Sequence, residues 1–299
     1  MKQKTGKRMQ VVIHAGAHHT DDDRLINCLS ANREMLAEHG TNVPDPQRYR
    51  RLVRDILHRA QDSGLAPDAR DILVDAISNE GAVDRLVLSN PGFFGTPKMA
   101  VGGGTFYGAA EHRLNLFRQL FPDDQIELFL GVVNPATFLP PLLRQTEFDT
   151  IEALLRGYEV AQLRWSELVT RIRTHHPDIP VTVWCNEDTP LIWSQVVREL
   201  AGIDPTVQFE GEFSLLEEIM TPAGLERFRG YVAAHQGMTE VQKRRVVAAF
   251  LDKFADEAAI EEELDVPGWT DAVVGTLTEL YDEDMFTVQR IQGVQVITP

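Results

Sequence analysis

Short apolar runs alternate with longer amphipathic stretches along most of this chain. The runs long enough for a buried strand are Gln10–Ala15, Arg85–Ser89, Gln125–Val133 and Val181–Asn186, and Val294–Thr298 has the pattern of an edge strand. Strands separated by helical stretches are typical of parallel sheets, because parallel neighbours need a crossover connection that usually contains a helix. The pattern therefore predicts an α/β fold, with a mostly parallel sheet flanked by helices.

The clearest helix is predicted to begin at Asp45-Pro46, since aspartate caps helices and proline fits the first turn. Helical spacing of apolar residues predicts further helices at Leu25–Leu36, Ala109–Leu120, Thr150–Thr174, Leu191–Ala201, Thr221–Gln236, Thr239–Glu263 and Thr270–Leu280. The carboxy-terminal third is thus nearly all helical. We expect a flexible segment 1–9 and one domain over 10–299, within which 206–285 forms a helical cap or subdomain.

Composition agrees with a globular protein of one or two domains, because 43% of the 299 residues are hydrophobic and 25% are charged. The basic start is followed by a strand pattern and by no long apolar segment, so we expect neither secretion nor a membrane span, and a cytoplasmic location. The two cysteines, Cys28 and Cys185, lie in apolar segments and are expected to be buried free thiols.

The net charge of −16 is concentrated near the carboxyl end of the chain. Between Asp252 and Asp284 there are twelve acidic residues and one basic residue, a net charge of −11. Such a field repels nucleic acid and anionic membranes, so neither is expected as a partner. The acidic helices form either a solvated face or a docking surface for a basic protein.

The segment Val11–Leu25 has the pattern of a strand, a tight turn at Gly16 and a helix. Ligands of open parallel sheets bind beyond the carboxyl ends of the strands, which makes this loop the first candidate for a small-molecule site. A helix N-terminus after such a loop suits an anion. Three consecutive carboxylates, Asp21, Asp22 and Asp23, stand there instead, where they repel an anion or cap the helix themselves.

The residues His14-Ala-Gly-Ala-His-His-Thr-Asp-Asp-Asp-Arg-Leu25 resemble the opening of sulfotransferases, H-x-G-x-H-K-T-G-T-T-S-L. The segment Val43-Pro44-Asp45-Pro46 resembles the V-x-P element that follows this opening. The tyrosine- and acid-rich segment Leu277–Asp284 is similar to a late helix of bacterial members. The resemblance implies a P-loop NTPase-like fold and a loop for the phosphosulfate of 3′-phosphoadenosine 5′-phosphosulfate (PAPS). The implied loop positions are Gly16, His19, Thr20, Asp21, Asp22, Asp23 and Arg24.

The departures from the family fall on its functional positions. His19 replaces the phosphate-binding lysine, and the three aspartates replace Gly-Thr-Thr. In the second donor element, Val133 replaces an arginine and Pro141 a serine, and neither side chain can bind phosphate. We therefore interpret the chain as a divergent bacterial sulfotransferase-like protein with a degraded PAPS site, a non-catalytic binding or regulatory homologue.

Two alternatives stay open on the sequence. An active transferase with a rebuilt donor site would move a sulfuryl or related group to a hydroxyl, with His18, His19 and Glu187 as the candidate catalytic residues. A metal site would draw on the nearby imidazoles and carboxylates, although their spacing matches no established metal motif. Its candidate ligands are His18, His19, Asp21, Asp22 and Asp23. The arginine row at 50–54 is a further candidate for binding an anion, and the segment Ser89–Phe94 is a candidate for lining the acceptor side.

Overall fold

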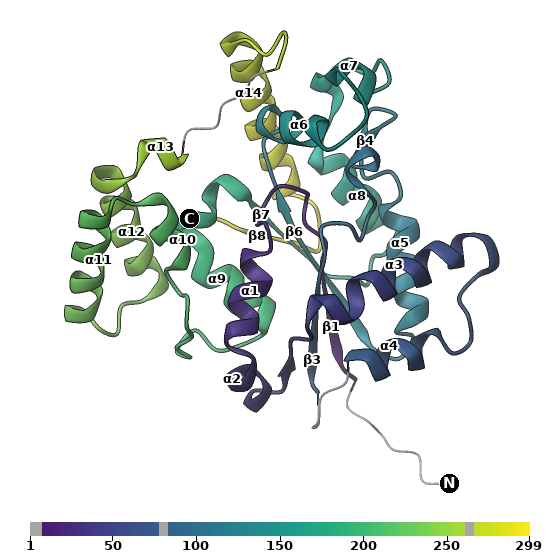
Figure 1. The fold of residues 1–299 in the computed structure, drawn as a ribbon, viewed down its shortest axis with the longest axis horizontal. Helices are drawn as coiled ribbons and strands as arrows, with labels where there is room; N and C mark the ends of the chain where they lie inside the picture. Colours follow the sequence, from purple (N-terminus) through teal and green to yellow (C-terminus); the bar gives the residue numbers. More distant parts are fainter. Residues whose placement is uncertain (1–7, 78–82, 261–265) are drawn as a thin grey trace.

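The sheet predicted from the sequence forms the centre of the molecule (Figure 1). The computed structural model describes residues 8–77, 83–260 and 266–299, and in these ranges six strands form one parallel sheet of order β2-β3-β1-β6-β7-β8. The strands are β1 (Gln10–His14), β2 (Thr41–Asn42), β3 (Arg85–Ser89), β6 (Gln125–Val132), β7 (Val181–Cys185) and β8 (Val294–Ile297). The α/β fold class is therefore confirmed. The expected flexible segment 1–9 lies mostly outside the described residues.

All five predicted strands are present, and each ends one residue earlier than predicted or at the predicted residue. Two features were not predicted: the edge strand β2 and a hairpin of β4 (Val101–Gly102) and β5 (Thr105–Phe106). Each of these strands has two residues, too few for an alternating pattern to be recognised.

The two faces of the sheet carry separate cores because successive strand residues point to opposite sides. Val11 and Ile13 of β1 face one core, and Val12 faces the other. The first face packs against α3 (Pro46–Ser63), α4 (Ala69–Ile77), α5 (Ala110–Leu120) and α8 (Trp165–His175). The second packs against α1 (Arg24–Ala31), α2 (Arg33–Glu38) and α9 (Thr189–Ala201). Figure 1 shows these two groups on opposite sides of the sheet.

The carboxy-terminal helices occupy two places. Helices α10 (Ser214–Ile219), α11 (Pro222–Ala234), α12 (Glu240–Phe254) and α13 (Glu257–Ile260) lie together beside α9. They share a small core of Leu216, Met220, Phe228 and Val247, and we call α10–α13 the helical lobe. Helix α14 (Asp271–Val288) instead packs on α8 and on α6 (Pro135–Arg144), and its Tyr281 and Met285 join the first core. The expected subdomain 206–285 thus includes a separate lobe and a helix of the main body.

Helix bounds differ from the predictions at several places. The predicted helix Leu25–Leu36 is two helices, α1 and α2, and the helix predicted over Thr270–Leu280 continues to Val288 in α14. The predicted helix Thr150–Thr174 is wrong as one element: it is α7 (Ile151–Leu154), a 3₁₀ turn (Val160–Gln162) and α8, with Arg156 and Gly157 at positive φ between them. The helix predicted to begin at Thr239 ends at Phe254, because the backbone of Ala255 bridges to Met220. Helices α4, α6 and α10 were not predicted. No helix within the described ranges has the length and hydrophobicity that a membrane span needs.

Candidate functional site

The loop after β1 lies at the carboxyl end of the central strand, between β3 and β6. Gly16 has φ +93°, and a side chain there would meet Pro91 at 3.1 Å, which explains the glycine. His19, Asp22 and Asp23 also have positive φ, at 57°, 45° and 65°. The loop thus follows a tightly curved path into α1, in agreement with the predicted strand, tight turn and helix.

The three aspartates of the loop have different partners. Asp21 caps α1, because its carboxylate accepts the Leu25 N–H at 3.2 Å and its carbonyl accepts the Arg24 N–H at 2.7 Å. Asp22 is exposed and contacts Arg24 at 3.3 Å. Asp23 occupies the N-cap position of α1, yet its side chain makes no capping bond and turns to α3.

Arg50 of α3 forms a bidentate ion pair with Asp23. Its two terminal nitrogens donate to the two carboxylate oxygens at 2.7 and 2.6 Å, and its Nε donates to the Ser89 carbonyl at 2.9 Å. The hydrogen bonds from Arg50 hold the pKa of the Asp23 carboxyl below its usual value, against the opposing effect of burial. Arg50, one member of the predicted arginine row, therefore supplies a positive charge to the loop. The Asp23 carboxylate of the chain itself already binds this charge.

A cavity of about 330 Å³ opens at this loop. Its wall includes the three aspartates and His19 from the loop, Arg50 from α3 and Asn90 after β3. Three carboxylates against one guanidinium give this wall a negative charge, so the cavity disfavours an anionic ligand.

His18 of the loop is buried, and His19 is partly buried. His18 is 7% exposed, and its backbone N–H donates to the Tyr107 hydroxyl at 2.9 Å while its Nδ1 lies 2.8 Å from the same oxygen. Burial lowers the pKa of His18 to about 4. His19 lines the cavity, burial lowers its pKa as well, and its Nε2 has no partner among the described residues. Both imidazoles are therefore neutral at pH 7 and cannot replace the lysine of the family as cations.

The other two residues assigned to the loop serve its structure. The Thr20 hydroxyl donates to the Ala17 carbonyl at 2.8 Å, which closes the turn. The Arg24 Nε donates to Glu218 of α10 at 2.8 Å, so this guanidinium ties the start of α1 to the helical lobe.

Glu187 lies in a 3₁₀ turn after β7, and it is not in the wall of the loop cavity. Its carboxylate accepts the Asn134 N–H at 2.7 Å, near the start of α6, and the Tyr281 hydroxyl at 3.1 Å. Burial raises the pKa of Glu187. The structure thus places this acid between α6 and α14, apart from His18 and His19.

The segment compared with the second donor element contains the start of α6. Asn134 caps this helix through a bond from the Ala136 N–H at 2.9 Å, and Val133 is buried, with its carbonyl bound by Trp165 at 2.9 Å. Pro141 lies inside the helix. Neither position offers a phosphate ligand.

Metal ligands do not converge at the loop. Within residues 8–77, 83–260 and 266–299, no group of three histidine, cysteine, aspartate or glutamate side chains has the geometry to hold a metal ion. The reason is that Asp21 and Asp23 already accept hydrogen bonds within the chain, while His18 packs on Tyr107. Both cysteines are free, and burial raises their pKa to about 12.

The acidic carboxy-terminal segment has both exposed and structural members. On α14, Asp282 and Glu283 are exposed, whereas Asp284 is 5% exposed and caps α8 by accepting the Trp165 and Ser166 N–H groups at 2.6 and 3.2 Å. Glu261, Glu262, Glu263 and Asp265 lie outside the described residues.

Sequence reasoning missed Tyr107, the partner of His18, since nothing near it in the sequence indicates a role.

No protein-family model matches this chain, and no curated protein was found to be related to it.

Proposed function

We propose that this protein is a non-catalytic binding or regulatory protein on a P-loop-like, sulfotransferase-like scaffold. A parallel sheet with a tight loop and a helix after its central strand supports the scaffold, and the motif at His14–Leu25 supports the family. Fold alone does not fix function, so the proposal depends on the chemistry of the loop.

The ion pair between Asp23 and Arg50 carries the proposal. A phosphate loop binds its anion with backbone N–H groups at a helix N-terminus and with a cation. Here the Asp21 carboxylate takes the Leu25 N–H, and the Asp23 carboxylate takes the nearby guanidinium. Carboxylates of the chain therefore stand in for the phosphosulfate of a donor nucleotide.

Loss of transfer chemistry follows from the same residues. A transferase must stabilise a leaving phosphate and place a base near the acceptor. His18 is buried against Tyr107, and Glu187 is engaged by Asn134 and Tyr281. His19 keeps a neutral imidazole with an unpartnered Nε2, so the loss of transfer rests on the phosphate contacts that Asp21 and Asp23 occupy.

The exposed acidic side chains of α14 suit a protein partner in the cytoplasm. Asp282 and Glu283 present carboxylates on the exposed side of α14, which favours a basic segment and disfavours nucleic acid. In this proposal the scaffold positions the acidic helix, and the loop cavity makes no contribution to catalysis.

Calorimetric titration with 3′,5′-adenosine bisphosphate tests the loss of the donor site. The wild-type chain is expected not to bind at millimolar concentration. Asp23→Gly frees Arg50 and suits the φ of +65° at this position, so this variant is expected to gain nucleotide binding. Asp22→Gly is the matched control: it removes the same charge from another positive-φ position of the loop but leaves the ion pair of Arg50 intact.

Micromolar binding to the wild-type chain would overturn the proposal and favour an active transferase with a rebuilt donor site. Equal behaviour of the two glycine variants would show that the ion pair does not close the site.

A further inference from the structure

A second cavity, of about 770 Å³, lies at the opposite end of the sheet from the β1 loop. It is bounded by the amino-terminal residues of the strands, by the second half of α9 and by α12 of the helical lobe. This volume is within the range of small-molecule sites. It shares no residue with the loop cavity.

The sheet side of this cavity is polar because the second face of the sheet changes character along the strands. Toward the carboxyl ends this face is apolar and packs on α9. At the amino ends the same face carries Gln10, Arg85, Glu127, Thr182 and Gln295. Side chains able to form hydrogen bonds thus line a region that the end of α9 at Ala201 leaves uncovered.

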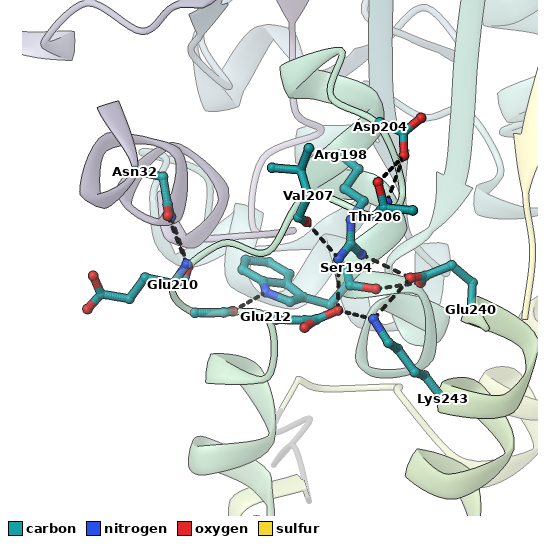
Figure 2. Close-up of polar contacts among 12 residues, drawn as sticks. Asn32, Ser194, Arg198, Asp204, Thr206, Val207, Glu210, Glu212, Glu240 and Lys243 are labelled. Carbon is teal, nitrogen blue, oxygen red and sulfur yellow. Dashed lines mark hydrogen bonds and ion pairs between the residues drawn. The ribbon is translucent and has the colours of Figure 1, made fainter. Parts of the chain in front are cut away.

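Most charges around the cavity are balanced. The Arg85 guanidinium donates to Glu127 at 2.9 Å and to the Gln10 side chain at 2.9 Å. Figure 2 shows Arg198 of α9 between Glu240 and Glu212, with Lys243 beside both carboxylates. These residues carry equal numbers of positive and negative charges, so together they have no net charge to attract a ligand.

Two opposite charges in the wall are not balanced. Arg244 of α12 donates to the Thr298 carbonyl at 2.9 Å and to the Gln195 side-chain oxygen, and among the described residues it has no carboxylate partner. The Glu199 carboxylate of α9 accepts from the Gln195 and Gln295 amides, both at 3.2 Å, and in the same ranges it has no cationic partner. The Gln195 amide lies between them, with its oxygen toward Arg244 and its nitrogen toward Glu199.

A ligand with one charge would leave the other charge of the wall unpaired. A carboxylate suits Arg244, because a guanidinium binds carboxylates through paired hydrogen bonds. An ammonium group suits Glu199, since a carboxylate only accepts hydrogen bonds. The buried Arg198, which is 5% exposed and whose Nε has no partner among the described residues, also lines the cavity and adds to its polar surface.

We propose that this cavity binds a small zwitterion, of the size of a free amino acid or short peptide. The ligand carboxylate pairs with Arg244, its ammonium group pairs with Glu199, and the row of polar residues at the strand ends surrounds its body. Because Arg244 belongs to the lobe and Glu199 to α9, the ligand bridges the lobe and the main body.

Thermal-shift measurements and calorimetry on the full chain test this site. The probes are the twenty L-amino acids and triglycine, each at millimolar concentration. At least one zwitterion is expected to bind and raise the Tm. Its carboxyl amide, which lacks the negative charge, and its N-acetyl form, which lacks the positive charge, are each expected to bind about tenfold more weakly or less.

Variants identify the site. Arg244→Gln and Glu199→Gln are each expected to weaken binding of the zwitterion about tenfold or more. The controls are Arg245→Gln, on the same helix but exposed, and Glu226→Gln, an exposed acid of α11; both are expected to bind as the wild type does. The Glu199 variant is expected to bind the N-acetyl form as well as it binds the zwitterion, because the ammonium group has lost its partner.

The proposal is overturned if no probe binds, if the blocked forms bind as tightly as the zwitterion, or if both site variants bind normally. Should Arg244→Gln fail to fold, Arg244→Lys takes its place, and the Glu199 variant tests the other end of the ligand separately. The titration with adenosine bisphosphate tests the cavity at the β1 loop and not this one. If the zwitterion proposal fails, the result for the β1 loop is therefore unaffected.

Discussion

At the scale of single residues, burial decides what the histidines of the β1 loop do. His18 stands in a motif typical of catalysis, but it packs on Tyr107 with 7% of its surface exposed. The folded chain therefore holds this imidazole neutral down to a pH of about 4, whereas in the unfolded chain its pKa is 6.5.

The pH dependence of stability reports this burial. Between pH 6.5 and about 4 the unfolded chain binds a proton at His18 and the folded chain does not, so the free energy of unfolding falls as the pH drops through this window. At pH 4.5 the loss from this group is about 2 kcal/mol relative to pH 7. Urea unfolding at both values measures it.

His18→Asn is the control, because asparagine keeps a polar group near Tyr107 but does not titrate. Between pH 7 and 4.5 its stability is expected to fall about 2 kcal/mol less than that of the wild type. Burial also lowers the pKa values of His14 and His19. Both residues are present in the two proteins, so their contributions to the pH dependence of stability cancel in the comparison. Parallel pH curves for the two proteins would contradict the prediction.

At the scale of elements, α6 shows how a tertiary contact overrides a local signal. Pro140 and Pro141 inside α6 make a helix unfavourable, because proline lacks the N–H that would bind the carbonyl four residues earlier. The carbonyl that Pro140 leaves without its usual donor belongs to Ala136. The Trp269 indole N–H binds this carbonyl at 2.8 Å, from a residue 133 positions away.

We predict that Trp269→Phe destabilises the protein by about 1 kcal/mol, because the Ala136 carbonyl loses its donor while an aromatic ring remains. Urea unfolding measures the difference from the wild type. Phe286→Leu, at an exposed position of α14, is the control and is expected to change stability by less than about 0.5 kcal/mol. Unchanged stability of the Trp269 variant would mean that this bond does not support α6.

The attachment of the lobe depends on Arg198, whose guanidinium contacts Glu212 and Glu240, both at 3.0 Å (Figure 2). Arg198→Met removes the buried cation and leaves two carboxylates with Lys243 alone, and we expect a loss of about 3 kcal/mol. Hydrogen exchange is expected to rise first in α10–α13. Arg245→Met, at an exposed arginine of α12, serves as the comparison and is expected to behave like the wild type. Equal exchange in both variants would show that the network does not hold the lobe.

At the scale of the whole molecule, the net charge of −16 is the basis for the proposed preference for a basic partner. We expect a labelled oligolysine peptide to bind at low ionic strength, and to dissociate as salt screens the acidic surface, whereas a labelled DNA duplex stays free. Fluorescence anisotropy measures both. Binding of the duplex at low salt would contradict the expected exclusion of nucleic acid.

The double variant Asp282→Asn, Glu283→Gln tests whether the proposed docking surface lies on α14. It removes two exposed charges of α14 and is expected to weaken peptide binding more than Glu226→Gln with Asp252→Asn, which removes two exposed charges from the lobe. Equal weakening would mean that net charge, and not the face of α14, attracts the peptide.

The amino-acid sequence by itself determined the five longer strands, most helices and the acidic β1 loop. These features depend on neighbours within a few residues: the apolar runs of β1, β3, β6 and β7, the Asp45-Pro46 start of α3, and the consecutive acids at 21–23. Local periodicity and capping chemistry are sufficient for them. The same evidence led to a continuous helix over Thr150–Thr174 and to no helix at α6, because each outcome depends on contacts from elsewhere in the chain.

Only the tertiary structure decided the partners of the charged groups. Asp23 and Arg50 are 27 positions apart, and Gln195 and Arg244 are 49 apart. Which carboxylate meets which guanidinium, and which charges stay unpaired in a cavity, depends on how α3, α9 and α12 pack on the sheet. Sequence spacing carries no information on such long-range pairs. The β1 loop was therefore found from its residues, whereas its internal ion pair and the second cavity were found only from the packed helices.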